Sequence, residues 1–318
     1  MAAMLQLVTG FTALIVGAAW LVSGSSALAK RLGVSDLMIG LTVVAFGTSA
    51  PELFVSVYAA TTGNAAVAIG NVLGSNAFNV LVILGISAAI YPIGVGKSTV
   101  RKEIPLSLLS AVLLFVMAND RRIDRGGFDA LTRIDGLVLL AFFTVFAYYT
   151  VGIARQDAKK GGSREAGGSV LRAVGLVVVG LAGLAGGARL AVAGAVAVAR
   201  SWGMSDAVVS LTIVAAGTSL PELATSAVAA YRKNADIAVG NVVGSNIFNI
   251  LLILGAASVI RPLPFEHHYN ADVLVVMGSH LLLLLWMFTG KKRKIDRWEG
   301  VLLLLAYVLY MALSVLRR

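Results

Sequence analysis

The sequence predicts an all-α integral membrane protein of ten transmembrane helices, arranged as two inverted repeats of five helices. Hydrophobic residues make up 58% of the 318-residue chain and charged residues only 13%, and the mean hydropathy is +0.88. A soluble domain carries about 25% charged residues, so this chain has too little charge to cover a surface that faces water. The second observation behind the prediction is a repeat: residues 47–53 read GTSAPEL and residues 217–223 read GTSLPEL.

Ten apolar stretches are long enough to cross a bilayer as helices, which takes about 20 residues. We predict these spans at residues 5–29, 36–62, 65–91, 100–118, 131–153, 170–199, 206–232, 235–261, 270–289 and 297–315. Strands that alternate with period two are absent from the pattern, which argues against a transmembrane barrel. The first stretch is not followed by a convincing cleavage site, so we keep it as part of the mature structure. The chain has no cysteine, which excludes disulfides and thiolate metal sites.

Lysine and arginine are distributed unevenly between the two sides of the predicted bundle. The side that holds the segment between spans five and six collects seventeen of them, against eight on the other side. Basic residues are enriched in the cytoplasmic loops of membrane proteins. We therefore expect an inner-membrane protein with residues 154–169 in the cytoplasm and both termini outside. The net charge of +10 then reflects topology and does not indicate a nucleic-acid partner.

The repeat extends to a second motif, because residues 70–79 read GNVLGSNAFN and residues 240–249 read GNVVGSNIFN. Corresponding segments are five spans apart, and since five is odd, the second copy must enter the membrane upside down. The predicted halves are 1–153 and 170–318, joined by a polar, flexible linker at 154–169. Inverted repeats are common in secondary transporters, whose binding sites lie at the midplane where the repeats meet.

The first motif of each copy predicts a broken helix, in spans two and seven. Pro51 has no backbone N–H and its ring clashes with the carbonyl four residues earlier, while Gly47 adds backbone freedom. Carbonyls near Thr48 should therefore be released, and at membrane depth these must be buried in protein or line a polar cavity. Glu52 follows directly, and residues 217–222 repeat the arrangement. A charge in hydrocarbon costs about 2.5–3.5 kcal/mol on insertion scales, so its repetition indicates an ion pathway.

The second motif of each copy carries a polar stripe on one helix face, because its members recur at i, i+4 and i+8. The stripe consists of Asn71, Ser75 and Asn79 in the first copy and of Asn241, Ser245 and Asn249 in the second. Glycines in the same motif, at 70 and 74 and at 240 and 244, have a spacing that permits close helix approach. Close approach would bring the stripe to the broken helix.

The combined groups are carboxylates, hydroxyls, amides and carbonyls, which suit hard cations such as calcium or sodium rather than zinc or copper. Calcium takes 6–8 oxygens, and two carboxylates also balance its charge. The groups expected at a calcium ion are the side chains of Glu52 and Glu222 with the carbonyls of Thr48 and Thr218. The groups available to sodium are the hydroxyls of Ser49, Ser75, Ser219 and Ser245 with the carbonyls of Ala45 and Ala215.

At these motifs the chain resembles the calcium/cation antiporter superfamily, and within it the prokaryotic sodium/calcium exchanger branch. The strong match covers residues 36–90 and 206–260. The resemblance implies alternating access, with four cation sites between spans two, three, seven and eight. It implies the same calcium and sodium ligands that the oxygen-bearing groups of the two motifs indicate in the preceding paragraph. It also implies that spans one and six slide across the core as a gating pair.

Two departures from related patterns refine the expected function. Asn249, which is expected to face Asn79, stands where some exchangers, including potassium-dependent ones, have Asp. This lowers the negative charge of the middle site and argues against potassium dependence. The cation/proton branch has an acidic residue where this chain has Gly74 and Gly244, so its absence favours sodium coupling. We therefore expect a sodium/calcium antiporter that exports calcium, with a calcium/proton antiporter as the alternative.

Other classes of function fit less well. An intramembrane hydrolase would need a nucleophile and a base, and no motif supports such a pair. Glu266, His267 and His268 are most simply a solvated loop, and His280 a buried polar group with a local partner. A channel does not need two inverted halves that rock about a shared site. We expect no cofactor, a monomer, and calcium, sodium and membrane lipids as the partners.

Overall fold

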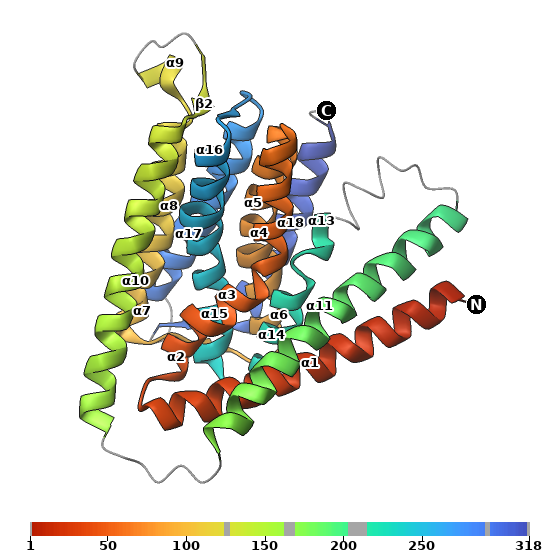
Figure 1. Cartoon of the computed structure of the whole chain (residues 1–318), viewed down its shortest axis with the longest axis vertical. Coiled ribbons are helices and arrows are strands. Elements are labelled where there is room, and N and C mark those ends of the chain that lie inside the picture. Colours follow the sequence, from red (N-terminus) through yellow and green to blue (C-terminus); the bar gives the residue numbers. More distant parts are fainter. Residues whose placement is uncertain (1, 124–127, 162–168, 203–214, 290–292, 317–318) are drawn as a thin grey trace.

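The computed structural model describes residues 2–123, 128–161, 169–202, 215–289 and 293–316 (Figure 1). This part of the chain is almost entirely helical, and its only strands are four of two residues each. Most helices stand upright in one bundle, and a long helix pair crosses the lower part of that bundle obliquely (Figure 1). The prediction of an all-helical membrane protein is confirmed.

The long pair consists of α1 (Ala2–Leu32) and α11 (Val170–Ser201), which lie antiparallel and side by side (Figure 1). Glycines recur every seven residues along the contact: Gly10, Gly17 and Gly24 on α1, and Gly180, Gly187 and Gly194 on α11. A Cβ atom on Gly187 would lie 2.8 Å from the backbone nitrogen of Leu14. The two backbones are therefore in direct contact, as small residues permit in membrane helix pairs.

The second predicted span is broken at Ser49. Its first half runs through α2 (Asp36–Ile39), a π-helical stretch η1 (Gly40–Val44) and α3 (Ala45–Thr48), and its second half is α4 (Ala50–Thr62). The two halves meet at an angle of 47°. Ser35 caps the first half by accepting a hydrogen bond from the backbone of Met38, as an N-terminal serine does.

The seventh predicted span has the same construction where it is described. A short helix α13 (Ala215–Gly217) is followed by Thr218 and Ser219 and then by α14 (Leu220–Tyr231). Residues 203–214, which include the start of the predicted seventh span, lie outside the described residues. The predicted break is present at the same place in both copies of the motif.

The third and eighth spans form the centre of the molecule. They consist of α5 (Ala65–Phe78), η2 (Asn79–Ile83) and α6 (Leu84–Ile90), and of α15 (Ala235–Ile247), η4 (Phe248–Leu254) and α16 (Gly255–Ile260). Their apolar windows are 72% and 78% buried, against 33% or less in the other single-helix candidate spans. The sequence does not predict that both spans widen into a π-helix at the last residue of the polar stripe, Asn79 or Asn249.

The glycine spacing brings helices close in one of the two copies. A Cβ on Gly240 or Gly244 would lie 2.8 Å from a backbone oxygen of Leu37 or Leu41. Gly70 and Gly74 have no such contact within 4 Å among the described residues. The segment that corresponds to residues 37–41 is 207–211, which is not described.

The remaining helices surround this centre: α7 (Lys97–Arg101), α8 (Glu103–Met117), α9 (Asp120–Ile123), α10 (Arg133–Gly161), α17 (Tyr269–Thr289) and α18 (Arg297–Leu316). The first part of the predicted linker at 154–169 is helical, because α10 continues to Gly161 instead of ending near residue 153. Residues 155–160 read RQDAKK, and Arg, Gln, Ala and Lys all favour helix.

Two short antiparallel strand pairs tie the halves together. Strand β1 (Ile93–Gly94) pairs with β4 (Lys294–Ile295), and β2 (Ala130–Leu131) pairs with β3 (Leu263–Pro264). Equivalent elements of the two halves lie at opposite ends of the bundle, since α6 is near its lower end and α16 near its upper end (Figure 1).

Seven described helices are long and apolar enough to cross a membrane, or up to eight if the bent second span counts as one. Two of the ten predicted spans are therefore not among them. The fourth, expected at 100–118, forms a helix of only 15 residues, α8, which is shorter than the usual length for a membrane crossing. The seventh begins within residues that are not described.

Candidate cation-binding site

The breaks in the second and seventh spans place two carboxylates at helix N-termini. Ser49 and Ser219 have closely similar backbone angles, φ −81° and ψ 5° against φ −90° and ψ 5°, and each precedes a helix with proline in its first turn. Glu52 and Glu222 lie in those first turns and are 1% exposed. The positive end of a helix dipole stabilises a carboxylate placed there. The fold therefore offsets part of the cost of burying two acidic groups.

Each carboxylate is hydrogen-bonded by the other half of the protein. Ser49 Oγ donates to Glu222 Oε1 at 3.0 Å, and Ser219 Oγ donates to Glu52 Oε1 at 3.2 Å. Ser75 adds a third hydroxyl, because its Oγ lies 3.4 Å from Glu52 Oε1 and 3.0 Å from Ser219 Oγ. The structure thus brings together the predicted glutamates and three of the four predicted serines.

Asn71 and Asn241 brace the two breaks. Asn71 donates through Nδ2 to the backbone oxygen of Glu52 at 3.3 Å and to Ser56 Oγ at 2.9 Å. Asn241 makes the same two bonds, at 3.3 and 2.9 Å, in the second half. Their side-chain oxygens accept bonds across the two halves, from Thr218 Oγ1 at 3.3 Å and from Thr48 Oγ1 at 3.0 Å. Both amides hold the broken helices in place.

The two alanines lie just before the breaks. Ala45 is buried, and its backbone oxygen accepts a hydrogen bond of 3.0 Å from the backbone N–H of Ser49. The same oxygen also accepts a longer hydrogen bond, of 3.4 Å, from Thr48 Oγ1. Ala215 is the first residue of α13, in the corresponding place before the second break.

Asn79 and Asn249 are held by two asparagines that the sequence analysis missed. Asn79 Nδ2 donates to Asn246 Oδ1, and Asn249 Nδ2 donates to Asn76 Oδ1, both at 2.9 Å. Asn76 and Asn246 occupy equivalent positions in the repeated GSNxFN motif, which was the available signal. They were missed because they lie beside the stripe of i, i+4 and i+8 residues and not on it.

Several buried oxygens of the predicted ligands have no hydrogen-bond partner among the described residues. They are Glu52 Oε2, Glu222 Oε2, Asn79 Oδ1, Asn249 Oδ1 and Ser245 Oγ. A buried polar group without a partner costs about 1–3 kcal/mol, and more when it is charged. All five atoms are oxygens, and four of them can only accept. Such a set requires a donor or a cation, and oxygen ligands without imidazole or thiolate suit a hard cation.

Among the hydrogen-bonded groups described above, the acidic side chains are the two glutamates. Among the described residues, no three His, Cys, Asp or Glu side chains gather in a way that could hold a metal ion. Glu266 and His268 pair at 3.4 Å in a loop where their side chains are 69% and 47% exposed, so they form a solvated pair as expected. His280 is buried and hydrogen-bonded, which also agrees with the sequence analysis.

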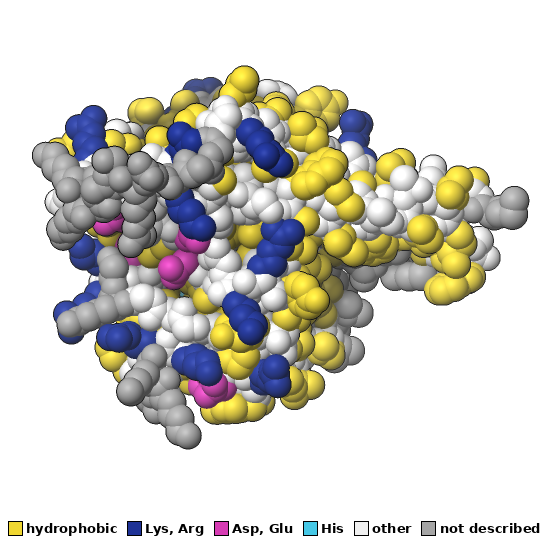
Figure 2. All heavy atoms as spheres, turned by 90° about the horizontal axis from the view of Figure 1, so that it is seen from below, with side chains coloured by type: hydrophobic (Ala, Val, Ile, Leu, Met, Phe, Trp, Pro, Cys, Tyr) yellow, Lys and Arg dark blue, Asp and Glu magenta, His cyan; other side chains and the backbone are white. Residues whose placement is uncertain are grey.

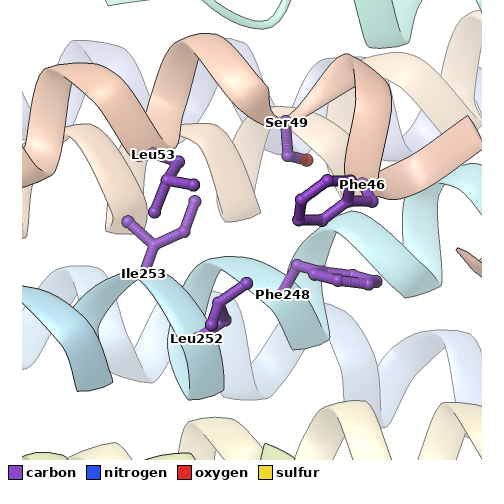
Figure 3. Close-up of a pocket in the computed structure, with 6 residues that line it drawn as sticks. All are labelled: Phe46, Ser49, Leu53, Phe248, Leu252 and Ile253. Carbon is purple, nitrogen blue, oxygen red and sulfur yellow. The ribbon is translucent and has the colours of Figure 1, made fainter. Parts of the chain in front are cut away.

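An apolar pocket reaches the site from one side. It is lined by Phe46, Ser49, Leu53, Phe248, Leu252 and Ile253 (Figure 3). The hydroxyl of Ser49 is the one polar side-chain group in this lining, and the rings of Phe46 and Phe248 stand beside it with centroids 5.7 Å apart (Figure 3). Phe46 is 52% exposed and Phe248 is 7% exposed, so this aromatic pair extends from the outside of the bundle to the side of Ser49.

Comparison with known proteins identifies the family. Residues 2–152 and 172–316 each match the family described as sodium/calcium exchanger protein. The putative antiporter CaxA of Alkalimonas amylolytica is 38% identical to this chain over 96% of both proteins. The inner membrane protein YrbG of Escherichia coli and the sodium/calcium exchanger MaX1 of Methanosarcina acetivorans are each 33% identical over 96% of this chain, and over 95% and 97% of their own lengths.

The fold agrees with a solved structure of the sodium-calcium exchanger NCX_Mj soaked with Na+ and Ca2+. That structure has a TM-score of 0.82 and 36% sequence identity to this chain, and the match covers 98% of each. A second NCX_Mj structure, soaked with neither ion, has a TM-score of 0.83. Together with two copies of the family sequence on a multi-span helical fold, these matches show that the chain belongs to the sodium/calcium exchanger family, whose members are membrane cation antiporters and not enzymes.

Proposed function

We propose that this protein is a secondary-active antiporter that exchanges sodium for calcium and exports calcium as sodium enters. The observation that carries the proposal is the group of buried oxygens without hydrogen-bond partners at Glu52, Glu222, Asn79, Asn249 and Ser245. Two carboxylates balance the charge of a calcium ion, and the neutral oxygens around them complete its preference for 6–8 oxygen ligands.

The proposed calcium ligands are the side chains of Glu52 and Glu222 with the backbone oxygens of Thr48 and Thr218. The proposed sodium ligands are Ser49, Ser75, Ser219 and Ser245 with the backbone oxygens of Ala45 and Ala215. Asn79 and Asn249 supply the middle of the site, and Asn71 and Asn241 belong to it by orienting the glutamates and threonines. In total we propose four cation sites that share the two carboxylates.

Shared ligands couple the two fluxes. Ser49 and Ser219, which we assign to sodium, hydrogen-bond the same carboxylates that we assign to calcium. Calcium and sodium therefore compete for one set of oxygens, and one ion must leave before the other binds. Alternating access then converts competition into exchange, because each crossing carries either sodium or calcium and not both.

A calcium/proton antiporter is the second candidate. It is favoured by the fact that carboxylates can carry protons as well as metal ions. We favour sodium because the site offers four serines beside the carboxylates, and because Gly74 and Gly244 provide no further acid. With amides at 79 and 249, we also propose that transport does not require potassium.

For the arrangement in the membrane we propose ten spans in two inverted five-helix repeats, at 1–153 and 170–318, joined by a cytoplasmic linker at 154–169. The family match in two separate stretches supports the division. The lower face of the molecule supports the orientation, because lysine and arginine gather on it and acidic side chains are few (Figure 2). Exposed basic residues assigned to this side are Lys30, Arg31, Arg101, Lys102, Arg155, Arg172, Arg232, Lys233, Arg293 and Arg297.

This face would meet the cytoplasmic leaflet of the inner membrane, where anionic lipids attract basic residues. Both termini then lie outside. We propose that the protein acts as a monomer, since both halves of the site come from one chain.

Calcium flux in proteoliposomes tests the function. The purified protein is reconstituted, and calcium movement is followed under a sodium gradient and, separately, under a proton gradient. We expect movement against a calcium gradient when sodium is the driving ion, and none above protein-free vesicles when only protons are. Movement driven by the proton gradient alone would replace sodium coupling with the second candidate.

A further inference from the structure

His280 lies in α17 outside the proposed ligand set and is 1% exposed. Its ring nevertheless connects to the site through hydrogen bonds. The Nδ1 atom lies 2.7 Å from the backbone oxygen of Val276, and the Nε2 atom lies 2.8 Å from Ser107 Oγ and 3.0 Å from Asn246 Nδ2.

These contacts fix which ring nitrogen carries the proton. A backbone oxygen can only accept a hydrogen bond, so Nδ1 must donate to Val276. In the neutral ring Nε2 is then the acceptor, and Asn246 must present its N–H₂ group to it. The opposite orientation of that amide would place two acceptors 3.0 Å apart.

The orientation of Asn246 sets the orientation of Asn79. With its nitrogen on His280, Asn246 turns its side-chain oxygen towards Asn79 and accepts a bond of 2.9 Å from Asn79 Nδ2. The oxygen of Asn79 is thereby the end of the amide that has no partner. An unbroken series of hydrogen bonds thus runs from the Val276 carbonyl to one of the proposed cation ligands.

The equivalent series in the other half does not need a histidine. Asn76 Nδ2 donates to the backbone oxygen of Asn246 at 3.3 Å, so Asn76 Oδ1 is free to accept from Asn249 Nδ2. That series begins at a backbone carbonyl directly. The residue that corresponds to His280 in the repeat is Ser110, whose hydroxyl bonds the backbone oxygen of Ser107 at 2.7 Å.

We infer that His280 is a positioning residue, which acts through Asn246 to keep the oxygen of Asn79, and not its N–H₂ group, directed at the cation. The two ends of an amide are nearly alike in shape, so the hydrogen-bond partners must decide which end faces the ion. A reversed Asn79 would present N–H groups to a cation and remove one ligand. This inference rests on the proposed function, because it requires a cation beside Asn79.

The test compares two substitutions of His280 with a control on the same helix. His280→Leu removes the acceptor, whereas His280→Gln retains one. The control is Asn270→Leu, because Asn270 and Asn119 exchange two buried hydrogen bonds of 2.7 and 2.9 Å. Asn270 lies ten residues before His280 on α17, about 15 Å along the helix, so its loss affects stability without reaching the site.

Calcium affinity is measured by calorimetry on the purified proteins, together with the melting temperature of each. Loss of a partner that orients a metal ligand weakens metal binding about 10–100-fold. We expect a rise of that size in the calcium Kd of His280→Leu, recovery of most of the affinity in His280→Gln, and an unchanged Kd in Asn270→Leu despite a lower melting temperature. An unchanged Kd in His280→Leu overturns the inference, as does an equal rise in all three variants.

A second variant decides the matter if His280→Leu does not fold. Asn246→Val interrupts the same series one residue closer to Asn79, and it too should raise the calcium Kd; an unchanged Kd would overturn the inference. Failure of the proposed function would give a different result from failure of this inference. Calcium would still bind with these relative affinities, but a sodium gradient would not drive its movement.

Discussion

Ser49 Oγ donates a 3.0 Å hydrogen bond to Glu222 Oε1 across 173 residues of sequence. The matching bond runs from Ser219 to Glu52 at 3.2 Å. The helix break in each half therefore holds the carboxylate of the other half. A substitution at either break should therefore alter ligands from both halves of the protein.

Replacing Glu52 or Glu222 by Gln should abolish calcium exchange while the protein remains folded. Each substitution keeps the shape and removes one of two negative charges. A unit charge at 4 Å is worth about 4 kcal/mol at the effective dielectric of a protein, so we expect transport to fall at least about 100-fold. Calcium uptake into proteoliposomes measures the effect.

The matched control for this change is Glu299→Gln. Glu299 is also buried, at 3% exposure, but its Oε2 accepts from the backbone N–H of Asp296 at the start of α18. Its variant should transport calcium at close to the normal rate. Near-normal flux in both Glu52→Gln and Glu222→Gln would refute the ligand assignment.

Alanine at Ser49 or Ser219 should weaken sodium binding more than calcium binding. Each substitution removes a proposed sodium ligand and a hydrogen bond to a carboxylate, a bond worth about 1.5–3 kcal/mol. We expect the half-saturating sodium concentration to rise about tenfold or more, with a smaller change for calcium. Titrations of transport rate against each ion measure the two effects.

Ser258→Ala is the comparison for the serine variants, because Ser258 is equally buried but, among the described residues, its hydroxyl bonds the backbone oxygens of Leu254 and Gly255 in its own span. It should leave both titrations unchanged. Equal shifts for sodium and calcium in Ser49→Ala would argue against separate ligand sets for the two ions.

Asn249→Asp should lower the melting temperature without calcium and increase the stabilisation that calcium gives. The new carboxylate would face Asn76 Oδ1, which now accepts a 2.9 Å bond from Asn249. A buried charge without a partner is strongly destabilising, whereas a bound cation would neutralise it and stabilise the folded state in proportion to its affinity. Thermal melts with and without calcium measure both quantities.

Asn270→Asp provides the contrast for that experiment, since it also introduces a buried carboxylate but lies away from the site. It should lower the melting temperature without enlarging the response to calcium. If both Asp variants respond to calcium alike, Asn249 does not lie in the cation site.

Gly187→Ala should disturb the α1–α11 pair, whereas Gly186→Ala should not. A Cβ on Gly187 would meet backbone atoms of Leu14 and Gly10 at 2.8 and 2.9 Å, but a Cβ on Gly186 meets no described atom within 4 Å. Overpacking costs about 1–3 kcal/mol, so the first variant should have a lower melting temperature and slower calcium transport. Equal melting temperatures and rates in the two variants would show that the glycine contact is not required.

Helix positions and breaks could be predicted from local signals. The second span was expected at 36–62 and is built from residues 36–62 with a break at Ser49. The length of an apolar stretch predicts a span, and a proline shortly after a glycine predicts a helix break. Both signals depend on neighbouring residues alone, so they do not require knowledge of the fold. Two helices differ in length from the prediction: α10 is longer and α8 is shorter. Hydropathy indicates which residues are apolar enough to lie in the membrane, but it does not indicate the residue at which a helix ends.

The contacts across the two halves could not be predicted in the same way. Sequence spacing placed Asn79 and Asn249 on a polar face, but their partners Asn246 and Asn76 come from the opposite copy. Nothing in a single helix indicates which residues of another helix, about 170 positions away, will meet it. The connection of His280 to Asn246 is of the same kind.

The crossed serine–glutamate bonds have a consequence for the origin of such a protein. Each half contributes one glutamate, and the serine at its helix break binds the glutamate of the other half. A single five-helix unit would therefore have no complete site, however well it folded. It could bind ions only by pairing with a second copy inserted in the opposite orientation. Gene duplication and fusion would then have joined into one chain two units that the site already required to assemble.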